Sequence, residues 1–163
     1  NVQIVIVMKK NKQNYLFFIF LIFLSIFSLH SVKAKDNNNF LSLKNDVVNL
    51  RQGPSFEYPI KLIYKKKYLP VHIIDKYEAW RKIKDFENNL GWIHISQLSK
   101  RKSAINIKNN SIIYKSSTIY SKPLAKLELG RLVLIKKCKP KWCKIETGSY
   151  IGWIYKNALW GKI

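Results

Sequence analysis

The sequence has 163 residues and a formal net charge of +21, with 30 Lys and Arg against nine Asp and Glu. This length allows one ordinary domain or two very small ones and excludes a larger set of domains. The charge would attract polyanions, but only four of the basic residues are Arg, which is the better partner for phosphate. The composition therefore argues against a protein selected to bind nucleic acid.

The amino end predicts export. Residues 8–14 are basic, and residues 15–29 are apolar and uncharged, an order typical of a secretory signal peptide. As a helix this apolar run would be roughly 22 Å long, short of the ~30 Å hydrocarbon core. The small side chain of Ala34 predicts cleavage directly after it. The alternative is that the segment is kept as an uncleaved anchor, since a slightly longer, tilted segment could span the bilayer. The protein would then contact the membrane only through this segment.

Two further expectations concern this end of the chain. Residues 1–7 do not begin with Met and precede a complete signal, so we interpret them as an over-extended reading frame. Residues 1–34 carry four lysines and no acid, so their removal would lower the net charge from +21 to +17. The exported chain would remain strongly basic and would be periplasmic or secreted.

Short runs rich in Ile, Val, Tyr and Trp follow the signal and predict β-strands. The clearest are VHIID at residues 71–75, WRKIK at 80–84 and GWIHI at 91–95, with turn residues at 87–91. No long helical period appears beyond the signal. Short strands at close spacing predict an all-β fold built as a small barrel or sandwich.

The second half of the chain repeats the first. GWIHISQL, which begins at Gly91, returns as GWIYKNAL at Gly152, and the Trp80 strand returns at Trp142. This is an internal duplication of roughly sixty residues, and the repeat is the expected structural unit. We expect a first repeat at 35–98, a connection at 99–109 and a second, divergent repeat at 110–163.

Cys138 and Cys143 are the only cysteines. In an exported protein an even number of cysteines predicts a disulfide, and the four residues between them include Pro140 and can close a hairpin. A metal site is the alternative, but zinc needs four ligands, and neither His72 nor His94 is close in sequence. We expect no metal and no cofactor.

Three segments together resemble the bacterial SH3-like domain family: NLRQGPSFEYP at residues 49–59, the Trp80-x-x-Ile83 strand and GWIHISQL. The second repeat keeps the W-x-x-I and G-W-I parts but has YKSSTIY at 114–120 where the Gly-Pro turn would be. The resemblance implies two tandem small SH3-like β-barrels after the signal segment. It also implies a non-catalytic binding role at the cell envelope.

Strand alternation selects the candidate ligand surface, because side chains two residues apart share a face. If Ile83, Ile93 and Ile95 lie in the core, then Trp80, Trp92 and His94 point outward. In SH3 relatives aromatic residues of these strands line a groove, so these three residues, with Tyr58 of the Gly-Pro loop, are the candidate ligand-binding residues. The alternative is that the tryptophans only cover an open barrel end or pack between the repeats.

Catalysis needs a nucleophile with a base, a pair of carboxylates or a metal. The exported part has two histidines, and its acids are scattered along the chain, so the sequence predicts no enzyme. The favoured function is an exported binding or adaptor protein that recognises a cell-wall peptide or an envelope protein segment. The alternatives are an electrostatic polyanion-binding protein and an accessory module of a cell-wall hydrolase system.

Overall fold

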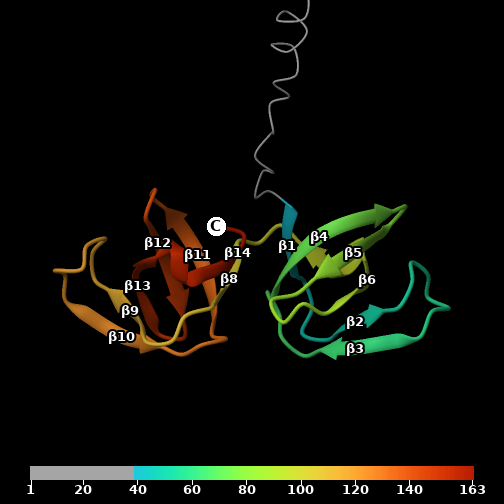
Figure 1. Ribbon diagram of the computed structural model, residues 1–163, viewed down its shortest axis with the longest axis horizontal. Helices are drawn as coiled ribbons and strands as arrows, with labels where there is room; N and C mark the ends of the chain where they lie inside the picture. The colour runs from blue at the N-terminus through green and yellow to red at the C-terminus, as the bar shows by residue number, and fades with distance from the viewer. Residues whose placement is uncertain (1–38) are drawn as a thin grey trace, which may run out of the picture. The chain divides into compact units, whose positions relative to one another are not determined.

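The computed structural model describes residues 39–163, which form two seven-stranded antiparallel sheets. Figure 1 shows the first sheet in cyan to yellow-green and the second in yellow to red. The predicted signal segment and the cleavage position after Ala34 lie outside the described residues. The predicted all-β fold of two tandem small barrels is confirmed, with one sheet for each repeat.

The first sheet has the strand order β3-β2-β6-β5-β4-β1-β7. Each strand runs antiparallel to its neighbours, and the β2–β3 and β4–β5 hairpins form its longest arms. The strands are β1 (Phe40–Leu43), β2 (Val48–Arg51), β3 (Ile60–Tyr64), β4 (Pro70–Tyr77), β5 (Trp80–Lys84), β6 (Leu90–His94) and β7 (Leu98–Ser99).

The second sheet repeats this order as β10-β9-β13-β12-β11-β8-β14. A 3-10 turn precedes the last strand in both sheets, η2 (Ile95–Gln97) in the first and η3 (Lys156–Ala158) in the second. The strands are β8 (Ser103–Asn106), β9 (Ser111–Tyr114), β10 (Pro123–Leu127), β11 (Leu132–Cys138), β12 (Trp142–Thr147), β13 (Tyr150–Tyr155) and β14 (Leu159–Gly161).

Each sheet closes around its own apolar core. Leu50, Ile83 and Ile93 are fully buried in the first, and Ile113 and Ile145 occupy the matching positions in the second. These residues are β-branched or branched aliphatic, and they alternate with partly exposed neighbours, which suits a strand with one buried face. The alternation that the sequence predicts is therefore observed for Ile83 and Ile93. The prediction is wrong for Ile95, which is 43% exposed because the strand ends at His94 and Ile95 begins η2.

The glycine of the repeated Gly-Trp motif allows two strands to pack closely. A Cβ on Gly91 would lie 2.6 Å from Leu50 Cγ and 2.7 Å from the Arg51 carbonyl oxygen. On Gly152 it would lie 2.5 Å from Ile113 Cγ2 and 2.7 Å from the Tyr114 carbonyl oxygen. The motif recurs because strand β6 must approach β2, and β13 must approach β9, more closely than a side chain would allow.

The segment between the repeats takes part in both of them. Residues 103–106, which fall in the expected connection, form β8 and pair with β11 and β14. Ile105 of this strand is buried in the core cluster of the first repeat, and Leu132 packs against the same cluster. The Phe40 and Trp160 rings meet edge to face at 4.9 Å. The apolar surface of each small repeat is thus partly covered by the other.

Within residues 39–163, no helix is long and apolar enough to cross a membrane.

Candidate ligand-binding site

The register of β5 and β6 places three of the predicted residues on one face of the first sheet. Trp80 is paired with His94, and Lys82 is paired with Trp92. Residues that pair directly across an antiparallel ladder project to the same side, and Ile83 projects to the other. The structure therefore brings Trp80 and His94 together, with their ring centroids 5.3 Å apart.

A third ring completes this cluster, and it was not among the predicted residues. The Phe56 ring of the loop between β2 and β3 lies 4.9 Å from Trp80 and 5.5 Å from His94. Phe56 is 60% exposed, whereas Trp80 is only 7% exposed. We call Phe56, Trp80 and His94 the three-ring cluster. In the sequence Phe56 comes shortly after the Gly-Pro turn, and this position is the feature from which its role could have been predicted.

Arg51 holds the loop that carries Phe56. Its Nη1 donates hydrogen bonds to the carbonyl oxygens of Phe56, at 2.9 Å, and Tyr58, at 2.8 Å. The guanidinium carbon also lies 5.7 Å from the centroid of the Phe56 ring. One guanidinium nitrogen thus bonds two carbonyl oxygens of the loop and restrains its conformation. Arg51 thereby orients the exposed ring of the cluster.

Tyr58 has a different neighbour from the one expected. Its ring lies over Gly53, where an added Cβ would be 2.6 Å from three of the ring carbons. Gly53 is required because Tyr58 occupies the space of a side chain. Within residues 39–163, the Tyr58 ring contacts neither Trp80 nor His94. The Phe56 ring lies against these two residues instead.

The imidazole of His94 is held by the turn that follows it. The Ser96 backbone N–H donates to His94 Nδ1 at 3.4 Å, and the Ser96 hydroxyl lies 2.7 Å from the same nitrogen. Because an N–H can only donate, Nδ1 is an acceptor and the neutral ring carries its proton on Nε2. His94 therefore offers a hydrogen-bond donor beside the apolar rings.

Trp92 extends this face away from the three-ring cluster. It is paired with Lys82 on one side and with Arg51 on the other. The Lys82 ammonium lies 6.0 Å from the Trp92 ring centroid, the outer limit of a cation–π contact. The face therefore combines a ring cluster at one end with a basic and aromatic pair at the other.

The second repeat covers the matching face with its own side chains. Trp142 is stacked on Tyr155 at 4.0 Å, and Tyr114 meets Trp142 edge to face at 5.7 Å. The ammonium of Lys139 lies 4.9 Å from the Trp153 ring and donates to the Ser117 hydroxyl at 3.1 Å. The most exposed ring of this stack is Tyr155, at 38%, whereas the first repeat presents Phe56 at 60%, so the first repeat is the candidate site.

The predicted disulfide between Cys138 and Cys143 is confirmed. The two cysteines face each other across the β11–β12 hairpin, with their Cα atoms 4.0 Å apart. The bond lies at the tip beside Trp142, where the first repeat has the pair Lys76 and Arg81. It fixes the end of the hairpin next to the stacked rings.

The fold uses Asp85, the one buried acid among residues 39–163. Asp85 accepts hydrogen bonds from the Tyr64 hydroxyl, at 3.0 Å, and from the backbone and side-chain nitrogens of Asn89, both at 2.8 Å. Burial, and then the negative charge of Asp85, raise the pKa of Tyr64 well above its ordinary value of 10.0. Within residues 39–163, no group of three or more His, Cys, Asp and Glu is placed to hold a metal ion.

Comparison with known proteins identifies the repeated unit. The family model described as bacterial SH3 domain matches twice, over residues 44–100 and 108–161. No curated protein matches the chain.

Among solved structures, NlpC2 from Trichomonas vaginalis is 16% identical, with a TM-score of 0.36 over 76% of this chain and 48% of that one. An NlpC/P60 family protein from Bacillus cereus is 12% identical, with a TM-score of 0.34 over 74% and 55%. The chain spans about half the length of these two proteins.

Proposed function

Because the chain belongs to the bacterial SH3 domain family, we propose that it is a non-catalytic, exported binding protein of the cell envelope. Its ligand would be a cell-wall peptide or a segment of an envelope protein. The three-ring cluster of the first repeat is the observation that supports this function. An exposed aromatic ring beside a hydrogen-bond donor suits the recognition of an extended chain.

The chemistry of the cluster suggests how an extended segment would be held. Phe56 would contact apolar or backbone portions of the ligand, and the buried Trp80 beneath it would support its ring. The Nε2–H of His94 would donate to a ligand carbonyl. The positive charges of Arg51 and Lys82 would favour a segment that carries a carboxylate. Truncating one central aromatic anchor of such a surface commonly costs about 2 kcal/mol or more of binding free energy.

The first experiment presents the protein to purified cell-wall sacculi and, in parallel, to envelope extract. Phe56→Ala is the informative variant, because this ring is mostly exposed and the barrel core does not depend on it. Tyr120→Ala is the matched control, an aromatic residue that is 92% exposed in the corresponding loop of the second repeat. We expect Phe56→Ala to weaken retention at least about tenfold and Tyr120→Ala to leave it unchanged.

Two results would count against the proposal. One is the absence of retention of the unmodified protein on both preparations. The other is equal retention of Phe56→Ala and the unmodified protein, with both shown to be folded by their unfolding transitions. The second result would leave a binding protein whose ligand contacts another surface.

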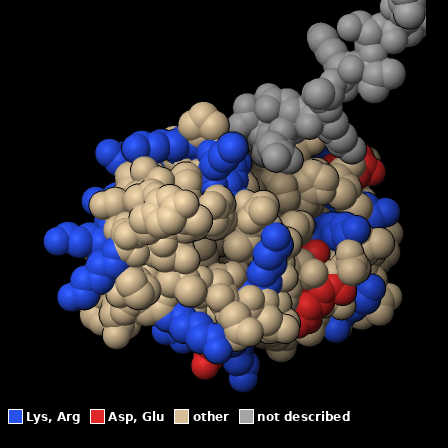
Figure 2. All heavy atoms as spheres, turned by 60° about the vertical axis from the view of Figure 1, so that its left-hand side comes forward, with Lys and Arg blue, Asp and Glu red and all other residues tan. Residues whose placement is uncertain are grey.

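The basic charge supports a second candidate, an electrostatic polyanion-binding protein. In the described part of the chain a single ion pair forms, between Lys136 and Glu146, so most of the positive charge has no acidic partner. Figure 2 shows the basic side chains spread around an uncharged area instead of forming one stripe. Salt separates the candidates, because polyanion binding falls steeply between about 0.05 and 0.2 M salt, whereas binding by aromatic rings depends on salt less.

A further inference from the structure

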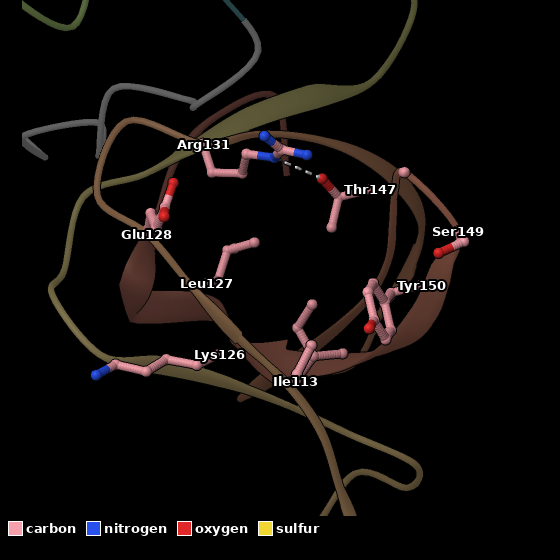
Figure 3. Close-up of a pocket in the computed structure, with 10 residues that line it drawn as sticks. Ile113, Lys126, Leu127, Glu128, Arg131, Thr147, Ser149 and Tyr150 are labelled. Carbon is pink, nitrogen blue, oxygen red and sulfur yellow. Dashed lines mark hydrogen bonds between the residues drawn. The ribbon is translucent and has the colours of Figure 1, made fainter.

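A hollow of about 320 Å³ lies in the second repeat between the loop before β11 and the β12–β13 turn. Figure 3 shows Ile113 and Leu127 projecting into it from its floor, with Arg131 along the rim. Ile113 is fully buried and Leu127 is 4% exposed. The hollow has an apolar floor and a cationic rim, and it is lined by none of the rings at the Trp142 face.

The first repeat fills the matching place with its own side chains. Tyr64, whose register position on β3 corresponds to that of Leu127 on β10, donates to Asp85. Phe86, from the turn between β5 and β6, packs against the core of the first repeat.

The second repeat has lost this filling. Its turn is one residue shorter, because seven residues separate Ile83 from Gly91 and six separate Ile145 from Gly152. Gly148 stands in the shortened turn and carries no side chain. The second repeat therefore has the smaller Leu127 in place of Tyr64 and no counterpart of Phe86, which leaves this place open.

The guanidinium of Arg131 is held in place but keeps free donors. Its Nε donates to the Thr147 hydroxyl at 3.4 Å, and that hydroxyl donates to the Leu132 carbonyl oxygen at 3.0 Å. Among the described residues it has no ion-pair partner, and both of its Nη groups make no other hydrogen bond. A Cβ on Gly148 would lie 4.0 Å from Nη2, so this end of the guanidinium lies beside the turn, and Gly148 places no side chain over it.

We propose that this hollow binds the free carboxylate end of a small acid or peptide whose terminal side chain is short and aliphatic. The two Nη groups of Arg131 would hold the carboxylate, because a guanidinium fork matches both of its oxygens. The aliphatic side chain would lie between Leu127 and the half-exposed ring of Tyr150, which also lines the hollow. The volume is at the lower end of the range for ligand pockets, which limits the ligand to a small group.

The two other charged residues of the rim have different roles. Lys126 points away from the hollow in Figure 3, so it adds positive potential without contacting the ligand. Glu128 also lines the hollow, and its carboxylate would repel a dianion. The site therefore suits a single carboxylate and disfavours phosphate.

The test measures amide shifts in nuclear magnetic resonance spectra of the protein with three probes: N-acetylglycylvaline, its carboxamide, and isovalerate. We expect the first probe to shift the signals of residues 128–131 and 147–150 in a saturable way, and the carboxamide to leave them unchanged. Binding of isovalerate as well would identify a site for small free acids, whereas binding of the peptide alone would identify a peptide terminus. Both results support the carboxylate contact.

Variants test the residues directly. Arg131→Gln should weaken binding about fivefold or more through loss of the charge-assisted pair, and Lys126→Gln, which removes the same charge, should change it less than about twofold. The double variant Leu127→Tyr, Thr147→Asp copies the filling of the first repeat and should abolish binding. Binding of the carboxamide equal to that of the acid, no saturable shift with any probe, or unchanged binding by a folded Arg131→Gln protein would overturn the proposal.

Discussion

Trp80 and Phe56 are in contact, yet they differ in how much of each ring is exposed. Trp80 is 7% exposed and its indole is packed, whereas Phe56 lies mainly outside the barrel. Strand alternation predicts which side of the sheet Trp80 occupies, but it gives no information about the loop that covers it. One residue of the three-ring cluster therefore serves mainly the fold, and another is available to a ligand.

Trp80→Ala should lower the free energy of unfolding by about 3 kcal/mol or more, because removing a packed indole leaves a cavity. Phe56→Ala is the control and should cost about 1 kcal/mol or less, since most of that ring is already exposed. Urea unfolding followed by circular dichroism measures both. Equal losses for the two variants would mean that the loop and the indole form one packed unit.

Tyr64 should make the free energy of unfolding depend on pH in the alkaline range. Its pKa is raised in the folded protein by burial and then by Asp85, so the folded state keeps a proton that the unfolded chain releases near pH 10. This contribution is complete below pH 10 and is lost as the pH rises above that value towards the folded pKa. The phenol thus adds an alkaline sensitivity to the first repeat.

Tyr64→Phe should cost about 1 kcal/mol at pH 7, where it removes a hydrogen bond to a buried carboxylate. Above pH 10 the difference between the variant and the unmodified protein should shrink, because the variant has no phenol to ionise. Unfolding in urea at pH 7, 9 and 11 measures this difference. A constant difference across the series would contradict the buried phenol as its source.

At the scale of the strands, two local features set the register. Cys138 and Cys143 are directly opposed in the β11–β12 hairpin, as the five-residue separation and Pro140 predict. Gly91 and Gly152 mark places where neighbouring strands approach too closely for a side chain. Both features are readable in the sequence, because they depend on residues a few positions apart and on the size of one side chain.

Replacing both cysteines by Ser should destabilise the protein by about 2 kcal/mol, the value expected from chain entropy for so short a loop. The loss should appear as faster hydrogen exchange in β11 and β12, with strands β4 and β5 unaffected. Adding reductant should reproduce this change in the unmodified protein and have no effect on the double variant. Exchange that is equally fast in both repeats would contradict a local role.

Gly91→Ala should destabilise the first repeat by about 1–3 kcal/mol, since the new Cβ would meet Leu50 and the Arg51 carbonyl oxygen. Leu90→Ala is the neighbouring control, because its side chain is 42% exposed and should change stability little. Thermal unfolding of both variants measures the difference. A Gly91→Ala protein as stable as the unmodified one would show that β2 can move to accept a side chain.

For the whole molecule, the connection between the repeats carries more structure than its composition suggests. SKRKSAINIKN at residues 99–109 is polar and basic and contains two Ile residues. It forms β8, and Ile105 enters the core of the preceding repeat. The segment is structured because β11 and β14 pair with it, and both lie well beyond it in the chain.

Export remains a prediction at this scale, since residues 1–38 lie outside the described part of the chain. Amino-terminal sequencing of the exported protein should begin at Lys35, because the apolar run is short for a span and Ala34 suits a signal peptidase. The same experiment on Ala34→Leu should show reduced processing. Recovery of residues 15–29 in the membrane fraction of the unmodified protein would instead identify an anchor.

The sequence alone determined the all-β class, the duplication, the disulfide and the side of the sheet on which Trp80 and His94 lie. These features follow from local spacing, from side-chain alternation along one strand and from the repetition of a motif. Only the tertiary structure placed Phe56 against Trp80, seated Tyr58 on Gly53 and opened the hollow beside Arg131. Each of these depends on how a loop folds onto a distant strand, and on whether a side chain elsewhere in the chain fills the same space, which no local pattern specifies.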